Sequence, residues 1–146
     1  MSLIKMGVIG TSKKVDERRV PIHPQHLNRL PENIRKQLIF EKGYGRPFNI
    51  EDEEISKVTG GIASRDELLS DLGTVIIAKP VLADLQDLKE GGTIWGYPHC
   101  AQQEQITQTA IDKKLTLIAF EDMYVWHPNG QKGRHTFYKN NGSLTR

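Results

Sequence analysis

Residues 74–78 read Thr-Val-Ile-Ile-Ala, a short run of apolar and β-branched residues that is continuous rather than alternating. Such a run is typical of a strand that is buried on both faces of a sheet. Similar runs recur at residues 6–9, 38–40, 93–95 and 115–120. We therefore expect a sheet built from these segments.

Segments with helix signals lie between these runs. Each segment shows one such signal: a proline in the first helical turn, acidic residues near its start with a lysine near its end, a capping-box pattern, or an apolar stripe along one side. The segments are residues 24–29, 50–58, 64–69 and 101–114. In the last of them, Ile106, Ala110 and Ile111 fall on one stripe.

The alternation of strands and helices predicts the fold class. Strand, helix and strand at this spacing favour an α/β domain with a mostly parallel, doubly wound sheet, of the Rossmann-like or flavodoxin-like type. The pattern loosens after residue 120, and residues 126–130, Trp-His-Pro-Asn-Gly, indicate a turn such as a hairpin tip.

The composition limits the class of protein and its partners. The chain has 146 residues, of which 37% are hydrophobic and 26% charged, so one globular domain is expected. A net charge of +2 without a basic block gives no sign of nucleic-acid binding, and no apolar run is long enough to span a membrane. The N-terminus lacks a signal-peptide pattern, and the single cysteine, Cys100, excludes an intrachain disulfide. A cytoplasmic location is therefore expected.

Residues 17–24, Glu-Arg-Arg-Val-Pro-Ile-His-Pro, follow the first predicted strand. In open α/β sheets, small ligands bind at the carboxyl ends of the strands, where this segment would lie. A guanidinium is a planar fork of donors that matches a carboxylate, so Arg18 and Arg19 indicate a grip for a small carboxylic acid. The alternative is that both arginines are solvated surface charges.

Two further residues stand where predicted strands end. Lys79 follows the run 74–78 and is kept extended by Pro80, and His99 closes the segment that follows the run 93–95. In a parallel sheet, Arg19, Lys79 and His99 would meet at one edge. They suit an acid with a carbonyl or imine: Arg19 would hold the carboxylate, Lys79 polarise the double bond and His99 move a proton. A solvated lysine and a packing or capping histidine are the alternatives for Lys79 and His99.

Other signals point to no site. The glycines in residues 7–13 lack the spacing of a phosphate-binding loop. Gly43 and Gly45 lack the third glycine of a dinucleotide fingerprint, because Phe48 stands at that position. The histidines and Cys100 show no metal-ligand spacing. A thiol–imidazole pair of Cys100 with His99 is not expected either, because adjacent residues of an extended chain project differently. The sequence therefore predicts no metal site.

Taken in order, the motifs resemble one family. Glu-Arg-Arg-Val-Pro at 17–21, Lys-Pro at 79–80 and Gly-Tyr-Pro-His at 96–99 are similar to the N-terminal domain of the alanine dehydrogenase and nicotinamide nucleotide transhydrogenase family. That family includes saccharopine dehydrogenases and carboxyethyl-ornithine synthase. The segment 41–45, Glu-Lys-Gly-Tyr-Gly, supports the resemblance, which extends over residues 6–141.

The resemblance implies a two-domain enzyme that passes a hydride between a nicotinamide cofactor and an amino or imino acid. By position, the family's carboxylate-binding arginine falls on Arg19, its substrate lysine on Lys79 and its acid–base histidine on His99. Residues 1–141 would be the substrate-binding domain and 142–146 a tail, and we expect the C-terminal dinucleotide-binding domain of the family to be absent from this chain. NAD or NADP would bind the full-length enzyme; no cofactor is expected on this chain, which alone is expected to be inactive.

Two departures point away from alanine as the substrate. Alanine dehydrogenases usually have an acidic residue between the lysine and the proline, whereas here Pro80 follows Lys79 directly. The pair His99-Cys100 and residues 124–134 look more like the saccharopine and carboxyethyl-ornithine branch. Enzymes of that branch make or break a secondary amine that joins an amino acid to a 2-oxo acid.

Two other functions stay open. The chain could be a stand-alone module that binds a small carboxylate without catalysis, or the soluble domain of a proton-translocating transhydrogenase. The expected partner is a small-molecule amino acid or 2-oxo acid, with no nucleic acid and no membrane, and the enzyme is expected to form a homo-oligomer.

Overall fold

The computed structural model describes residues 3–139. Its main feature is a six-stranded sheet in which every neighbouring pair of strands is parallel. The strands are β1 (Met6–Ile9), β2 (Leu38–Glu41), β3 (Gly61–Ala63), β4 (Thr74–Ile77), β5 (Thr93–Gly96) and β6 (Thr116–Ala119). This confirms the predicted α/β class and parallel sheet. The predicted tail, residues 142–146, lies outside the described residues.

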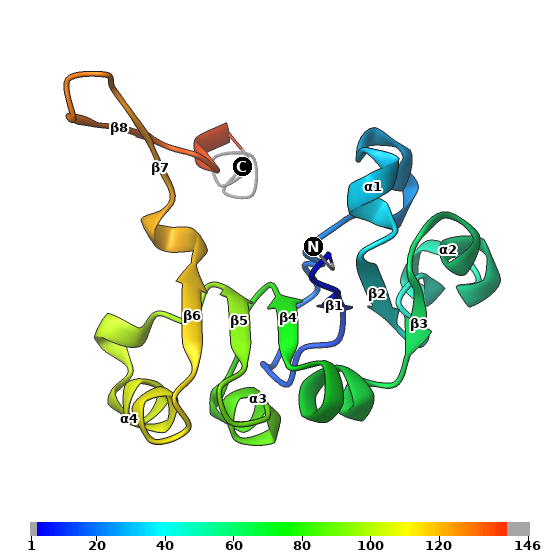
Figure 1. Ribbon diagram of the computed structural model, residues 1–146, viewed down its shortest axis with the longest axis horizontal. Coiled ribbons are helices and arrows are strands. Elements are labelled where there is room, and N and C mark those ends of the chain that lie inside the picture. The colour runs from blue at the N-terminus through cyan, green and yellow to red at the C-terminus, as the bar shows by residue number, and fades with distance from the viewer. Residues whose placement is uncertain (1–2, 140–146) are drawn as a thin grey trace.

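The strand order is β3-β2-β1-β4-β5-β6. The chain therefore winds outward from β1 in one direction and then returns to wind outward from β4 in the other. Figure 1 shows this as β1 standing between β2 and β4. In such a sheet, the crevice for ligands opens at the carboxyl ends of the two central strands.

Helices cover both faces of the sheet. The α-helices are α1 (Glu32–Arg35), α2 (Asp52–Val58), α3 (Leu82–Asp87) and α4 (Glu104–Asp112). The 3₁₀ helices are η1 (Pro24–Arg29), η2 (Arg46–Phe48), η4 (Cys100–Gln102) and η5 (Phe120–Asp122), and η3 (Glu67–Leu72) is a π-helix. Helices α3 and α4 lie along the same side of the sheet (Figure 1).

Two apolar cores lie on opposite faces of the sheet. In β1, Val8 packs with Leu27 of η1 and Ile55 of α2, whereas its neighbour Ile9 packs into the core that contains Leu85 of α3. Successive side chains of a strand point to opposite faces, so this alternation places a helical layer on each side. The sheet is doubly wound, as predicted.

Two predicted helices differ in detail. Residues 24–29 form a 3₁₀ helix, which is short because Pro31 keeps Leu30 extended. The segment 101–114 divides into η4 and α4 at Gln103. Of its predicted stripe, Ile106 and Ala110 are buried, but Ile111 is 64% exposed, so the expectation for Ile111 was wrong. The strand beside it, β6, is one of the two edge strands of the sheet.

Among the α-helices and the strands of the six-stranded sheet, α1, β3 and α3 have no counterpart in the sequence prediction. Gly61, which follows the predicted helical segment 50–58, is the first residue of β3 and has a φ of 128°. All three residues of β3 are half-buried, so this edge strand carries no continuous apolar run. The predicted capping box is confirmed: the amide of Glu67 donates to Ser64 Oγ at 3.2 Å and that of Ser64 to Glu67 Oε2 at 2.8 Å.

The predicted turn at 126–130 is the tip of a hairpin. Strands β7 (Tyr124–Trp126) and β8 (Lys132–His135) pair antiparallel, and in Figure 1 they project beyond the carboxyl end of β6. After the hairpin, the ring of Phe137 packs on Phe120, with 5.2 Å between centroids. Across residues 3–139, no helix has the length and apolar character that a membrane crossing requires.

Candidate functional site

The loop after β1 is fixed by a buried carboxylate. Glu41, the last residue of β2, accepts hydrogen bonds from the amides of Gly10 and Thr11, each at 2.9 Å, and from Thr11 Oγ1 at 2.6 Å. Glu41 is only 5% exposed. These three bonds satisfy the carboxylate and hold the start of the loop against the neighbouring strand.

Arg65 joins the same loop to the other half of the sheet. Its Nη1 donates to Thr11 O at 2.9 Å and lies 3.6 Å from Glu41 Oε1, while its Nη2 contacts Asp84 of α3. Asp84 is fully buried and also accepts from the amide of Val81 at 2.8 Å. We call Thr11, Glu41, Arg65 and Asp84 the edge network; it connects the segments that follow β1, β2, β3 and β4.

Arg19 holds a carboxylate of its own chain. Its Nε and Nη2 donate to the two oxygens of Glu17 at 2.7 and 2.6 Å, and its amide donates to Glu17 Oε1 at 3.0 Å. The Glu17 side chain is 5% exposed and that of Arg19 is 41% exposed. The hydrogen bond from Arg19 is the main cause that lowers the pKa of Glu17 from 4.5 to about 2, with a smaller contribution from Lys79 and with burial acting in the opposite direction. Glu17 is therefore ionised at neutral pH.

Lys79 interacts electrostatically with Arg19 and Glu17. Burial is the largest cause that lowers the pKa of its ammonium, followed by the positive charges of Lys14 and Arg19, whereas Glu17 raises it. The backbone oxygen of Lys79 accepts from Ser12 Oγ at 3.4 Å, which ties the end of β4 to the loop after β1. Arg19, Glu17, Lys79 and Lys14 thus form one charged cluster at the carboxyl edge of the two central strands.

We expect the pKa of Lys79 to move in opposite directions in two variants. Lys14→Met removes a positive neighbour and should raise it toward the ordinary value, whereas Glu17→Gln removes the opposing carboxylate and should lower it further. The pKa can be followed by NMR of the Lys79 side chain across pH. Lys114→Met, at an exposed ion pair with Glu90, is the control and should leave it unchanged. A shift of the same sign in both variants would contradict this arrangement.

Tyr44 anchors the arginine segment to the core. The side chain is 3% exposed, and its hydroxyl donates to Ile22 O at 2.7 Å and accepts from Ile22 N at 3.1 Å. Burial is the main cause that raises the pKa of this hydroxyl, so it stays protonated and able to donate. The ring also packs edge-on against Phe40 at 4.8 Å between centroids.

Removing this hydroxyl should weaken the fold. Tyr44→Phe leaves the amide and carbonyl of Ile22 without these partners, which we expect to cost about 1–2 kcal/mol of unfolding free energy. Urea denaturation measures the loss. Tyr124→Phe is the matched control, because within residues 3–139 its hydroxyl has no hydrogen-bond partner, and the change should be below about 0.5 kcal/mol. Equal losses in the two variants would show that the hydroxyl of Tyr44 does not anchor the loop.

His99 lies at the end of β5, where the chain makes a sharp turn. Its φ of 48° is in the left-handed region, and Glu121 Oε1 accepts from its amide at 2.7 Å. The same oxygen is 3.7 Å from His99 Nδ1. Gly96 allows the turn to start against β4, since a Cβ there would stand 2.0 Å from the carbonyl oxygen of Ile77.

The three residues predicted from the sequence all lie at the carboxyl edge. Arg19 and Lys79 interact with each other electrostatically. The ring of Tyr97 stacks on that of His99, with 6.1 Å between the ring centroids. The convergence of all three on one cleft stays a prediction.

Arg18, the neighbour of Arg19 in the predicted grip, does not share the ion pair of Arg19 with Glu17. It is exposed, and it lines a cleft of about 520 Å³ at the same edge of the sheet. The other residues of this cleft, which we call the Arg18 cleft, are Gly10, Thr11, Ser12, Glu17, Val20, Pro47 and Phe48.

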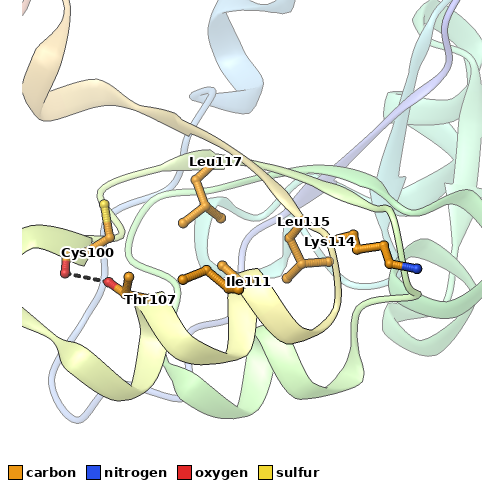
Figure 2. Close-up of a pocket in the computed structure, with 7 residues that line it drawn as sticks. Cys100, Thr107, Ile111, Lys114, Leu115 and Leu117 are labelled. Atoms are coloured by element: carbon orange, nitrogen blue, oxygen red, sulfur yellow. Dashed lines mark hydrogen bonds between the residues drawn. The ribbon is translucent and has the colours of Figure 1, made fainter.

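A second hollow lies away from these charges. Figure 2 shows an outer groove of about 410 Å³ between α4 and β6, with Ile111, Leu115 and Leu117 in its wall. Thr107 Oγ1 donates to the backbone oxygen of Cys100 at 2.7 Å. The groove is apolar and accounts for the exposure of Ile111. Cys100 is a free thiol there, and in residues 3–139 no cluster of three or more metal-ligating side chains exists.

Sequence reasoning missed the partners of the predicted residues. The ion pair between Glu17 and Arg19 was not predicted, although an acidic residue two positions before an arginine is a signal for a local pair. An acidic residue that ends a buried strand, as Glu41 does, is also a signal, because its charge needs partners. Arg65, Asp84 and Glu121 carry no such local signal.

Comparisons with known proteins agree on one relationship. Residues 8–132 match the family described as "Alanine dehydrogenase/PNT, N-terminal domain". The alanine dehydrogenase of Methanococcus maripaludis is 32% identical over 78% of this chain and 31% of that protein. The N(5)-(carboxyethyl)ornithine synthase of Lactococcus lactis subsp. lactis is 29% identical over 79% of this chain and 36% of that protein.

Solved structures share the fold. An L-alanine dehydrogenase superposes with a TM-score of 0.67 at 23% identity, covering 87% of this chain and 34% of that one. A transhydrogenase from Sinorhizobium meliloti gives 0.65 at 16% identity, covering 82% and 36%. The chain spans about a third of the length of the curated relatives that it matches.

Proposed function

Because the chain belongs to the alanine dehydrogenase/PNT N-terminal domain family, as its motifs indicated, we propose that it is the substrate-binding half of an NAD(P)-dependent oxidoreductase that acts on amino or imino acids. The observation that carries this proposal is the bidentate grip of Arg19 on a carboxylate, next to Lys79. The fork geometry that binds Glu17 is the geometry that would bind the carboxylate of a substrate.

Each of the three residues has a defined role in the proposal. A substrate carboxylate takes the place of Glu17 on Arg19, or shares the guanidinium with it. The Lys79 ammonium then donates to the carbonyl or imine of the substrate and stabilises developing negative charge. His99, held by Glu121, accepts or donates the proton at the amine or carbonyl.

The same edge does not fit a nicotinamide dinucleotide. In this strand order, a dinucleotide places its pyrophosphate at the N-terminus of a helix that follows β1 directly. Here the amides of Gly10 and Thr11 donate to the carboxylate of Glu41, and the chain reaches η1 only at Pro24. The donors that a phosphate needs are occupied, and the carboxylate would repel it. We therefore assign the cofactor to a separate domain of the enzyme.

The isolated chain should not bind the cofactor tightly. We expect calorimetric titration with NAD and NADP, oxidised and reduced, to give no dissociation constant in the low micromolar range, because Glu41 occupies the amides of Gly10 and Thr11. Pyruvate is the positive control and should bind through Arg19. Low-micromolar binding of any of the four dinucleotides would contradict the assignment of the cofactor to another domain.

A second, finer candidate is an enzyme that forms secondary amines. Pro80 directly after Lys79 and the hairpin β7–β8 favour it over an alanine dehydrogenase. In a polypeptide that carries both domains, NADH or NADPH oxidation with pyruvate should then require an amino acid such as ornithine rather than ammonia. Oxidation with pyruvate and ammonia alone would assign alanine as the product. Binding of pyruvate without any turnover would favour a stand-alone binding module, and hydride exchange between two dinucleotides would favour a transhydrogenase.

A further inference from the structure

The strand β6 has an open outer side. It lies at one end of the strand order, and among residues 3–139 no strand pairs with that side (Figure 1). The amide of Thr116 donates to the carbonyl of Gly92 at 2.9 Å, so the backbone groups of Thr116 and Ile118 face β5. Because this direction alternates along a strand, the amides of Leu117 and Ala119 point outward. They are the donors that an added strand would need.

The composition of β6 does not block such pairing. Edge strands of native proteins are usually protected by a charged residue, a proline or a bulge. The sequence Thr-Leu-Ile-Ala at 116–119 contains no charged residue and no proline. Its Ile118 side chain is 40% exposed, which presents apolar surface at the edge itself. An uncharged, apolar edge of this kind favours the addition of a strand.

The outer groove runs beside this edge on the face that carries α4 (Figure 2). Ile111 of α4 is 64% exposed and lines the groove with Leu115 and Leu117. An occupant that covers the whole surface must therefore supply a strand for β6 and an apolar helix beside it for Ile111. A second copy of this chain supplies both, because β6 and α4 are neighbours in it.

The charges near β6 match a second copy in the antiparallel orientation. Lys114 lies four residues before Ile118, and Asp122 lies four residues after it. If a two-fold axis passes at Ile118, Lys114 of each copy comes to the end of the strand where the partner's Asp122 lies. Both side chains are exposed, and Asp122 has no ion pair within the described part of the chain. This charge complementarity indicates a self-complementary contact.

We propose that β6 pairs antiparallel with β6 of a second copy of this chain, so that the two sheets join into one continuous sheet. Leu117 then stands opposite the partner's Ala119, and their outward amides find carbonyl acceptors. Ile118 packs against the partner's Ile118 on one face of the joined sheet. On the other face, the two-fold axis brings the α4 helices side by side, and Ile111 packs across the outer groove.

The size and strength of the contact can be measured by sedimentation equilibrium of the 146-residue chain. The wild type should form a dimer of twice the 16.6 kDa of one chain. Ile118→Lys sets two like charges face to face at the axis and should weaken dimerisation by about 100-fold or more. Ile34→Lys is the matched control, because Ile34 is 38% exposed in α1, and it should leave dimerisation unchanged.

Two charge reversals test the orientation without altering β6. Lys114→Glu and Asp122→Lys each place like charges side by side, twice in the dimer, and should each weaken dimerisation by about tenfold. The double variant restores opposite charges and should return the dissociation constant to within about threefold of the wild-type value. This rescue decides the orientation even if Ile118→Lys fails to fold.

Hydrogen–deuterium exchange identifies the surface that pairs. The amides of Leu117 and Ala119 should exchange slowly where the wild type is dimeric and quickly in Lys114→Glu at a concentration where that variant is monomeric. A wild type that is monomeric at millimolar concentration would overturn the proposal, as would a dimer in which the double variant is not rescued. Slow exchange of both amides in a monomer would show that another segment of the same chain covers this edge, and would also overturn it.

Discussion

Replacing Arg65 with methionine is expected to lower the unfolding free energy by about 3 kcal/mol. Asp84 is fully buried and would lose its only cationic partner in the described part of the chain, and Glu41 would lose a positive neighbour. Breaking a buried pair from one side costs this much because the other charge is left without compensation. The loss stands at the lower end of the usual range, since Asp84 keeps the amide of Val81 and Glu41 keeps its bonds to the β1 loop.

Lys13→Met is the matched control for Arg65→Met. It breaks an ion pair of similar geometry with Asp87, at 2.6 Å, but both side chains there are about half exposed, at 41% and 52%. We expect a loss of about 0–1 kcal/mol, because exposed pairs contribute little. Urea denaturation of the two variants decides the matter. A loss at Arg65 no larger than the loss at Lys13 would show that the edge network does not hold the central strands together.

Replacing His99 with asparagine is expected to lower turnover at saturating substrate by about 100-fold or more in a polypeptide that carries both domains. Asparagine can still hydrogen-bond in this place but cannot carry a proton near neutral pH. Because the loss concerns proton transfer, the pH–rate profile should also lose one limb. Steady-state kinetics across pH measure both effects.

His127→Asn, at the tip of the hairpin, is the control for His99→Asn and should leave turnover unchanged. Glu121→Gln tests how His99 is held. It keeps an acceptor for the amide of His99, so we expect it to lower turnover much less than His99→Asn does. Wild-type turnover and an unchanged profile in His99→Asn would show that the acid–base role of this residue is wrong.

The sequence was sufficient to predict the central strands. β1, β2 and β4 have buried residues on both faces and are each dominated by apolar residues, and β5 contributes Ile94 and Trp95 to the same signal. The edge strand β3 could not be found in this way, because Gly61–Ala63 contains only one bulky apolar residue, whereas the other edge strand, β6, lies in the apolar run 115–120. α3 was missed for a related reason, since its key residue, Asp84, is polar yet fully buried.

The place of the candidate site could be predicted, but not its internal contacts. Residues that follow parallel strands meet at one edge, which is why Arg19, Lys79 and His99 could be singled out. The pairing of Arg65 with Thr11 joins residues 54 positions apart, and the sequence gives no signal for it. The state of Arg19 was also unforeseen, because pairing with Glu17 depends on the local turn and not on the sheet.

The central claim is that Arg19 binds the carboxylate of a small acid at the carboxyl edge of the sheet. The most direct measurement is an NMR titration of the ¹⁵N-labelled chain with pyruvate, followed at the Nε–Hε signal of Arg19. We predict a saturable shift of this signal in the wild type and in the control Arg29→Gln, which removes an exposed arginine of η1, and the loss of pyruvate binding in Arg19→Gln. Undiminished binding of pyruvate to Arg19→Gln, or shifts confined to other parts of the chain, would contradict the account.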